Sequence, residues 1–381
     1  MSKSNDSTGD TLNSQTNPYH FYQFRKNPEE LEKIKKRPVR RFYERQNDLL
    51  DKFKIVDAII DAAPEQETGE PEPQQRHLSS ERTIQLAVRI SFAANLILFA
   101  SKVSVAALSG SLSVLASTVE SFLDLISSGI IVYTARYIKS RDYYYKYPVG
   151  KARMEPLGIV VFAVIVTISF LQILVSSVRR LMDPTEGSAS LKLDETGAIL
   201  LLVNVFVKAI LWLWCRSIKG SANVRALAID HKNDVIFNTA SSWFLAVAVE
   251  TNWWYIDPVG AILLCIYIIY EWMGVLMENI RRLLGTTAKP EQLNQLSYLA
   301  CRFSPLILQL DTVRAYHAGE RLFVEIDIIL PPDTPLNRAH DIGEALQEAV
   351  EKLDMVERCF VHLDYEGTHA IEHTGSLKKS T

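Results

Sequence analysis

Six apolar stretches, each of about 20 residues, lie between Ile84 and Leu276 and are dominated by Leu, Ile, Val, Ala and Phe. A helix of that length rises about 30 Å, which matches the hydrocarbon core of a bilayer. Because a chain in lipid must satisfy its own backbone hydrogen bonds, such stretches form transmembrane helices. The sequence therefore predicts an α-helical membrane protein with six transmembrane helices, at about 87–108, 112–136, 155–178, 194–216, 226–249 and 257–277.

Lys and Arg are distributed unevenly between the loops that join these spans. The loops after the second and fourth spans are basic, whereas the loops "LSGS" and "ETNWWYIDP" contain neither Lys nor Arg. Since basic loops remain in the cytosol, we expect both termini to be cytosolic. The polar N-terminus has no short apolar core of a cleaved signal peptide, so the first span would insert the chain. We expect an endomembrane (vacuole, Golgi or ER) rather than the plasma membrane, although no address signal stands out.

Charge and cysteine usage exclude several classes of protein. The chain has 41 basic and 44 acidic residues, which argues against a nucleic-acid binder with its strongly basic field. The four cysteines form no CxxC pair, so neither a disulfide framework nor a zinc ribbon is indicated. The polar segments contain no nucleophile–base constellation and no phosphate loop. We therefore expect no enzyme and no bound cofactor.

The N-terminal segment, residues 1–80, is polar. Its Ser, Asn, Pro, Glu and Gln content cannot bury a core, which predicts a largely disordered cytosolic tail. Within it, apolar residues from Phe42 to Ile60 recur at near-helical spacing and predict a short amphipathic helix near 40–60. This helix would pack on the protein's own body or, alternatively, bind a partner.

The C-terminal segment, residues 281–366, follows the membrane domain of residues 81–280. Its pattern reads helix, strand, strand, helix, strand, with "HAGER" as a hairpin turn and "RLFVEIDIIL" alternating as a strand does. We expect a cytosolic α+β domain of the αββαβ, ferredoxin-like kind, with two helices on one face of the sheet. Such a short module would pack against a copy of itself or sense a ligand. Residues 367–381 are expected to be a disordered tail.

Two predicted spans carry pairs of carboxylates, Glu120 with Asp124 and Asp230 with Asp234. An ionisable residue at the centre of a span costs about 2.5–3.5 kcal/mol on insertion scales, so it requires a partner or a function. Residues four apart share one face of a helix, where two carboxylates repel each other unless a cation lies between them. Two facing pairs would form an oxygen-only site for a divalent cation. Alternatively, the pairs lie in the interfacial layer with salt-bridge partners.

The type of ligand bears on the type of ion. Carboxylate and amide oxygens suit Mg²⁺, Ca²⁺ and Mn²⁺, whereas imidazole and thiolate favour Zn²⁺. If the metal-free carboxylates take up protons, metal and proton compete for the same groups, as in an antiporter. Lys102 and Lys208 lie in the first and fourth spans and would either pair with a carboxylate or extend to the membrane edge.

Three further residues are auxiliary candidates at this site. Asn95 and Asn238 offer amide oxygens at a plausible depth in the first and fifth spans. His231 follows Asp230 and points about 100° around the helix from it, which favours a supporting or entrance role over direct ligation.

These features together resemble the cation diffusion facilitator family over roughly residues 80–365. The stretches "YPVGKARMEPLG" and "RRFYERQNDLLDKF" are similar to its manganese-type branch. Zinc-type members have HxxxD in the fifth span, whereas this chain has Asp230 at the first position, giving DxxxD as in manganese-type members. The resemblance implies a homodimer that exports Mn²⁺ from the cytosol in exchange for H⁺, by alternating access, into an organelle lumen or outside.

The second span departs from the manganese-type pattern. That branch usually has DxxxD there as well, but this chain has Glu120, a carboxylate one methylene longer. The ranking of Mn²⁺ against Fe²⁺, Ca²⁺ or Zn²⁺ therefore stays open. The alternatives are a Zn²⁺ or Fe²⁺ transporter of the same family, or a metal sensor or scaffold that does not transport.

A second metal site is a candidate in the C-terminal domain. "FVHLDY" resembles the stretch where zinc-type members place regulatory metal ligands, with His362 and Asp364 alternating onto one face of a strand. His317 and His340 are further candidates for this site. The alternative for each histidine is a solvated position on the surface.

Overall fold

A computed structural model describes residues 21–62, 75–109, 112–138, 147, 150–182, 195–218, 220–251 and 253–367. The chain folds as two compact units. The helical unit comprises Pro73–Thr286 and His317–Arg321, and the α/β unit comprises Met1–Glu72, Thr287–Tyr316 and Leu322–Thr381. Of the expected tails at residues 1–80 and 367–381, residues 1–20, 63–74 and 368–381 lie outside the described residues.

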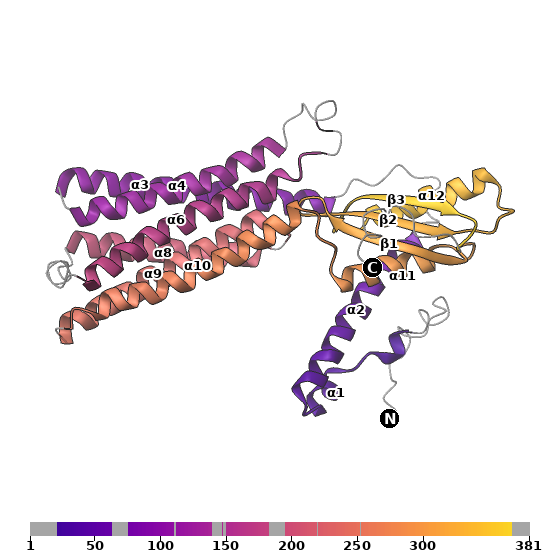
Figure 1. Ribbon diagram of the computed structural model, residues 1–381, viewed down its shortest axis with the longest axis horizontal. Coiled ribbons are helices and arrows are strands. Elements are labelled where there is room, and N and C mark those ends of the chain that lie inside the picture. The colour runs from indigo at the N-terminus through magenta and orange to yellow at the C-terminus, as the bar shows by residue number, and fades with distance from the viewer. Residues whose placement is uncertain are drawn as a thin grey trace, which may run out of the picture. The chain divides into compact units, whose positions relative to one another are not determined.

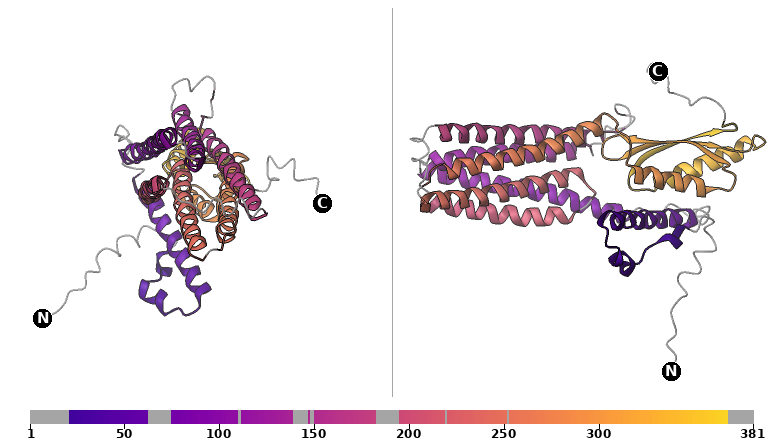
Figure 2. Two further views of the ribbon diagram at one scale, coloured as in Figure 1. Left: turned by 90° about the vertical axis from the view of Figure 1, so that its left-hand side faces the viewer. Right: turned by 60° about the horizontal axis from the view of Figure 1, so that its bottom comes forward.

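Six long helices run side by side in the described part of the helical unit (Figure 1). They are α3 (Gln75–Ser109), α4 (Leu112–Ile138), α6 (Met154–Met182), α8 (Glu195–Ser217), α9 (Ala222–Thr251) and α10 (Ile256–Leu283). Each corresponds to one predicted span, and Figure 2 shows the same bundle from two further directions. The largest difference is at α3, which begins at Gln75 and not near residue 87, because the polar stretch before the span continues the helix.

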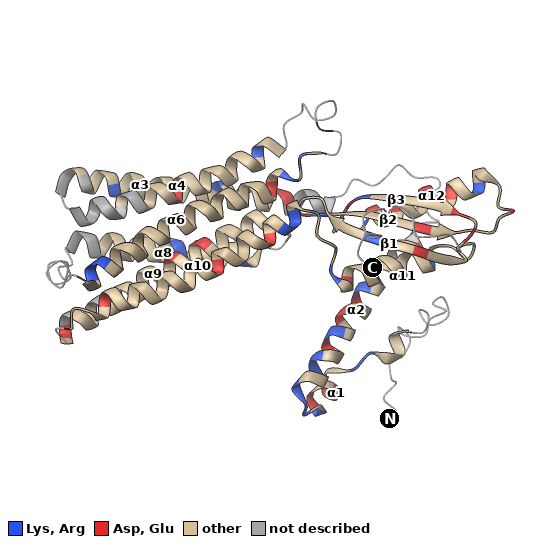
Figure 3. Cartoon of the chain, in the orientation of Figure 1, with Lys and Arg blue, Asp and Glu red and all other residues tan. Residues whose placement is uncertain are grey.

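Among the described residues, four of these helices contain segments long and apolar enough to cross a membrane: Glu81–Val105, Met154–Met182, Ile199–Ser217 and Ile256–Leu283. The acidic pairs lie on the other two long helices, α4 and α9. Figure 3 shows the helices of this unit as mostly uncharged, with a few isolated acidic and basic positions. The unit is therefore a helical membrane domain, as the sequence predicts.

Close packing within the helical unit uses small and aromatic residues. Gly158 of α6 faces Thr134 of α4 so closely that an added Cβ would lie 2.7 Å from the threonine Cγ2. Small residues of this kind let membrane helices approach each other. Phe162 of α6 packs edge-on against Trp272 of α10, with ring centroids 5.1 Å apart, and both side chains are fully buried. Helix α6 thus contacts both α4 and α10 and fixes the position of α4 beside it.

The α/β unit contains the predicted αββαβ order. Its elements are α11 (Pro290–Phe303), β1 (Gln309–His317), β2 (Leu322–Ile329), α12 (Leu336–Glu351) and β3 (Val356–Asp364). The sheet order is β1-β2-β3, and β2 and β3 are parallel, since α12 forms the crossover between them. Gly319 has φ of +99° in the turn between β1 and β2, a conformation that suits glycine.

One apolar core holds the sheet and its helices together. The alternate residues Val324, Ile326 and Ile328 of β2 are fully buried. Leu296 of α11 and Leu346 of α12 belong to the same cluster, so both helices cover one face of the sheet, as predicted.

The N-terminal segment folds onto this unit. It contains a 3₁₀ turn (Phe21–Phe24), α1 (Pro28–Lys33) and α2 (Arg37–Ala62), which covers the predicted amphipathic helix. Leu50, Phe53 and Val56 of α2 are buried in the core of the α/β unit. The Phe53 ring stacks on Tyr298 of α11 with centroids 4.0 Å apart. Of the two alternatives for this helix, the structure shows packing on the protein's own body.

A buried carboxylate joins α2 to α11. Tyr298 Oη and Arg302 Nη1 each donate a hydrogen bond to Asp57 Oδ1 at 2.9 Å, and Tyr22 Oη donates to Asp57 Oδ2. Burial raises the pKa of both tyrosine hydroxyls, and the neighbouring Asp57 raises it further. Asp57 therefore accepts hydrogen bonds from three side chains that are far from it in sequence.

Candidate metal centre

Three of the predicted carboxylates line one small cavity inside the helical unit. Asp124 comes from α4, and Asp230 and Asp234 come from α9. The cavity has a volume of about 20 Å³, and its lining also includes Ser127 and Ser169. A space of roughly 10–15 Å³ or more on this measure holds a single water, so the cavity has room for one small ion without its hydration shell.

The acidic pair of α9 is buried as its spacing predicts. Asp230 is 3% exposed and Asp234 is 6% exposed. No donor among the described residues lies within hydrogen-bond distance of Asp230 Oδ2. A buried polar atom without a partner costs about 1–3 kcal/mol, and more when the group is charged. This oxygen is therefore an available ligand for a cation or a proton.

Lys208 of α8 provides the positive charge at this site. Its Nζ lies 3.1 Å from Asp124 Oδ2 and also donates to Asp234 Oδ2. Lys208 is 1% exposed, so its ammonium is buried with the two carboxylates. The sequence left open whether this lysine pairs with a carboxylate or extends to the membrane edge, and the structure shows that it pairs.

His231 lies closer to the carboxylates than its direction on the helix suggests. Asp230, His231 and Asp234 each offer one ligand atom, and these atoms lie within 4.8 Å of one another. This is the only such group of three or more His, Cys, Asp or Glu side chains in the part of the chain that the structure describes. The ring Nε2 lies 3.1 Å from Ser91 Oγ of α3.

The two auxiliary asparagines have different roles. Asn95 Nδ2 donates to Ser128 Oγ at 3.3 Å, and Ser128 Oγ donates to the backbone oxygen of Asp124 at 2.9 Å. Asn95 thus supports the turn of α4 that carries Asp124. Asn238 Nδ2 donates to the backbone oxygen of Asp234 at 2.8 Å, one turn along α9. Glu120 lies on α4 one turn before Asp124, but its side chain is outside the described residues.

The candidate ligands of the C-terminal domain lie on three elements, β1, α12 and β3. His340 is exposed on α12, 3.5 Å from Asp341 and 3.8 Å from Glu344. His362 Nδ1 on β3 lies 3.7 Å from Asp327 Oδ1. His317 ends β1. Asp364 Oδ1 accepts a hydrogen bond from the backbone N–H of Tyr365 at 2.7 Å.

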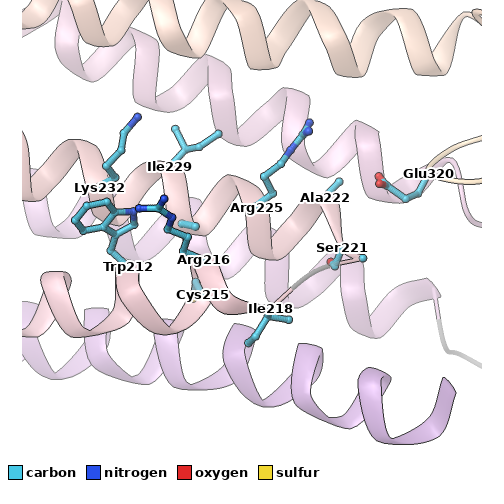
Figure 4. A pocket seen from close by; sticks show the side chains of 12 residues that line it. Trp212, Cys215, Arg216, Ile218, Ser221, Ala222, Arg225, Ile229, Lys232 and Glu320 are labelled. Carbon is cyan, nitrogen blue, oxygen red and sulfur yellow. The ribbon is translucent and has the colours of Figure 1, made fainter. Parts of the chain in front are cut away.

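A larger cavity, of about 440 Å³, lies between α8 and α9 (Figure 4). Its lining includes Arg225, Ile229 and Lys232 of α9, which share one helix face. Asp230 and Asp234 line the other cavity, and Lys232 forms an ion pair with Glu271 of α10. The larger cavity is therefore separate from the carboxylate site, and Lys232 belongs to another face of α9.

Two family models match the chain. Residues 88–284 match the "Cation efflux transmembrane domain", and residues 288–366 match the "Cation efflux protein, cytoplasmic domain". The first range contains all the residues of the small cavity, and the second contains the sheet with α11 and α12.

Several plant proteins are similar along most of their length. The chain is 42% identical to Metal tolerance protein 11 of Arabidopsis thaliana over 338 residues, covering 88% of this chain and 84% of that protein. It is 42% identical to Metal tolerance protein 5 of Oryza sativa subsp. japonica over 344 residues, covering 90% and 81%. It is 41% identical to Metal tolerance protein 10 of Arabidopsis thaliana over 340 residues, covering 89% and 78%.

These matches cover both units and agree with the resemblance carried by the acidic pairs. The family consists of cation efflux transporters and not of enzymes. The chain therefore belongs to the cation efflux family, also named the cation diffusion facilitators.

Proposed function

We propose that this protein exports Mn²⁺ from the cytosol in exchange for protons. The observation that carries the proposal is the small cavity lined by Asp124, Asp230 and Asp234. Carboxylate oxygens suit Mn²⁺ better than they suit softer ions, which prefer imidazole or thiolate. The fifth-span pair starts with an aspartate, where the zinc-type pattern has histidine.

Proton coupling follows from the crowding of the carboxylates. When no metal is bound, the three acidic side chains exceed the single positive charge of Lys208 by two, so the arrangement favours taking up a proton. An arriving metal ion displaces that proton, because both occupy the same oxygens. Protons delivered from an acidic compartment would then drive metal release there, which supports antiport by alternating access into an organelle lumen or to the outside.

The assembly and location belong to the same proposal. The C-terminal match is to the family's cytoplasmic domain, which supports a homodimer formed through the α/β unit with both termini in the cytosol. We propose an endomembrane as the location, because proton-driven export there would store Mn²⁺ in an acidic lumen.

Uptake into proteoliposomes with an acidic lumen tests the function. We expect Mn²⁺ uptake that collapses when the pH gradient is removed. Asp234→Asn keeps the shape of the side chain but removes a ligand charge, and we expect it to lower uptake by about tenfold or more. Glu250→Gln is the matched control, because Glu250 is an exposed carboxylate at the far end of the same helix. Undiminished Mn²⁺ uptake by Asp234→Asn would show that the cavity is not the pathway.

A Zn²⁺ transporter is the second candidate, because a ring nitrogen of His231 lies within reach of the ligand oxygens. Imidazole is a common zinc ligand. The same liposomes separate the candidates: uptake of Zn²⁺ or Fe²⁺ without Mn²⁺ would favour these ions, and metal binding without uptake of any ion would favour a sensor or scaffold.

A further inference from the structure

An ammonium group lies between the two helices that supply the carboxylates. Lys208 of α8 contacts Asp124 of α4 at 3.1 Å and also pairs with Asp234 of α9. Both contacts are made to the Oδ2 atoms of these residues. A divalent ion held by Asp124 and Asp234 would therefore share these two carboxylates with the ammonium.

The Lys208 side chain is too short to carry its ammonium to the end of its helix. It precedes the end of α8 at Ser217 by nine residues, which is about 13 Å along the helix axis. A four-carbon stem does not span that distance to the membrane edge. Because an isolated buried charge is costly, the ammonium stays close to the carboxylates even when it does not contact both Oδ2 atoms.

The formal charges of the described side chains at this site favour a divalent cation. Asp124, Asp230 and Asp234 together with Lys208 have two negative charges in excess. A divalent cation neutralises that excess, whereas a monovalent cation leaves one charge uncompensated in a low-dielectric environment. Asp230 Oδ2 has no donor among the described residues, so it is the oxygen that an entering ion can contact before any ion pair is broken.

We propose that the Lys208 ammonium is a tethered competitor of the transported cation. When no metal is bound, it holds the Oδ2 atoms of Asp124 and Asp234, and it gives them up when a divalent ion binds. The flexible stem of lysine permits this shift, which the rigid planar guanidinium of an arginine would not. The inference rests on the proposed transport function and adds a residue that sets the affinity of the site.

The competition has two effects on transport. Metal binding must break two ion pairs, so the lysine lowers the affinity for every divalent ion. Return of the ammonium to the carboxylates then assists release of the metal on the far side of the membrane. Lys208 would therefore make the site weak enough to unload, and its removal would produce a site that binds tightly and releases slowly.

Metal titration of the purified full-length protein at fixed pH tests this inference. Lys208→Met keeps an unbranched side chain, one atom shorter, and removes the charge. We expect the Kd for Mn²⁺ to fall by about tenfold or more, the effect of one close charge pair. Mn²⁺ turnover in proteoliposomes should fall at saturating metal, because release is slower. Lys232→Met is the matched control: it removes a lysine that is ion-paired with Glu271 on another face of α9, and its Kd should match that of the unaltered protein.

A second variant, which keeps the charge, should not tighten metal binding. Lys208→Arg retains the positive charge and binds carboxylates more rigidly, so we expect a Kd equal to or higher than that of the unaltered protein. A folded Lys208→Met with an unchanged or higher Kd overturns the inference, and so does a Lys208→Arg that binds more tightly. Asp234→Asn separates a failure of the proposed metal site from a failure of the role of Lys208. If Asp234→Asn loses metal binding while Lys208→Met has an unchanged Kd, the role of the lysine is refuted but the metal site is not. Unchanged binding by Asp234→Asn refutes the metal site itself.

Discussion

Replacing Asp57 by asparagine should release α2 from the α/β unit. The substitution keeps the size of the side chain but removes the charge that faces Arg302 at 2.9 Å. Both side chains of this pair are 8% exposed, so solvent screens them little. Arg302 would keep its charge in a buried position next to a neutral amide.

The magnitude follows from the burial of the pair. Removing one partner of a buried ion pair costs about 3–5 kcal/mol, because the other charge remains uncompensated. Asparagine retains one carbonyl oxygen as an acceptor for Tyr298 or Tyr22, so we expect the lower end, about 3 kcal/mol. Since 1.4 kcal/mol is a factor of ten, opening of α2 should become about 100-fold more frequent.

Hydrogen exchange of the full-length protein, read by mass spectrometry over α2, measures this opening. Amides from Leu50 to Ile60 should exchange about 100-fold faster in Asp57→Asn, while those of β2 keep most of their protection. Asp48→Asn is the matched control, because Asp48 is an exposed carboxylate on the same helix. Exchange in Asp57→Asn within about threefold of the unaltered protein would refute the role assigned to this ion pair.

Two further predictions concern the α/β unit. Burial and the neighbouring Asp57 raise the pKa of Tyr22 above its usual value of 10.0, so the contribution of Tyr22 to stability is complete below about pH 10 and is lost as the pH rises beyond it. Calorimetry between pH 9 and pH 11 should therefore show a steeper fall in melting temperature for the unaltered protein than for Tyr22→Phe, and equal slopes would contradict this assignment. The two cysteines of this unit should react differently, because Cys301 is exposed whereas Cys359 is fully buried and burial raises the pKa of Cys359 to about 12. N-ethylmaleimide should label Cys301 in the native protein and Cys359 only after unfolding, and labelling of Cys359 in the native protein would show that this core opens.

The elements of both units were predictable because their signals are local. Span length and strand alternation depend on neighbours in sequence, and the spacing of Asp230 and Asp234 alone places both on one face of α9. The start of α3 was predicted too late, because hydropathy locates the membrane segment and not the end of the helix.

The partners of buried charges were not predictable to the same degree. Which carboxylates Lys208 contacts depends on the rotation of α8 against α4 and α9, which no local pattern contains. Its place in an apolar span left open whether it pairs with a carboxylate or extends to the membrane edge. Asp57 carried a clearer signal, since it lies between Phe53 and Ile60 on the apolar face of its helix, where a carboxylate requires a buried partner.

The contact of α2 with α11 also constrains how the chain is made. Asp57 and its partners Tyr298 and Arg302 are 241 and 245 residues apart in sequence. At a synthesis rate of about 5–20 residues per second, α2 leaves the ribosome roughly 10–50 s before α11 exists. All six long helices of the described chain are made in that interval. The apolar face of α2, with Leu50, Phe53 and Val56, must therefore be kept from aggregating during membrane insertion, and a nascent chain stopped before Pro290 would expose it.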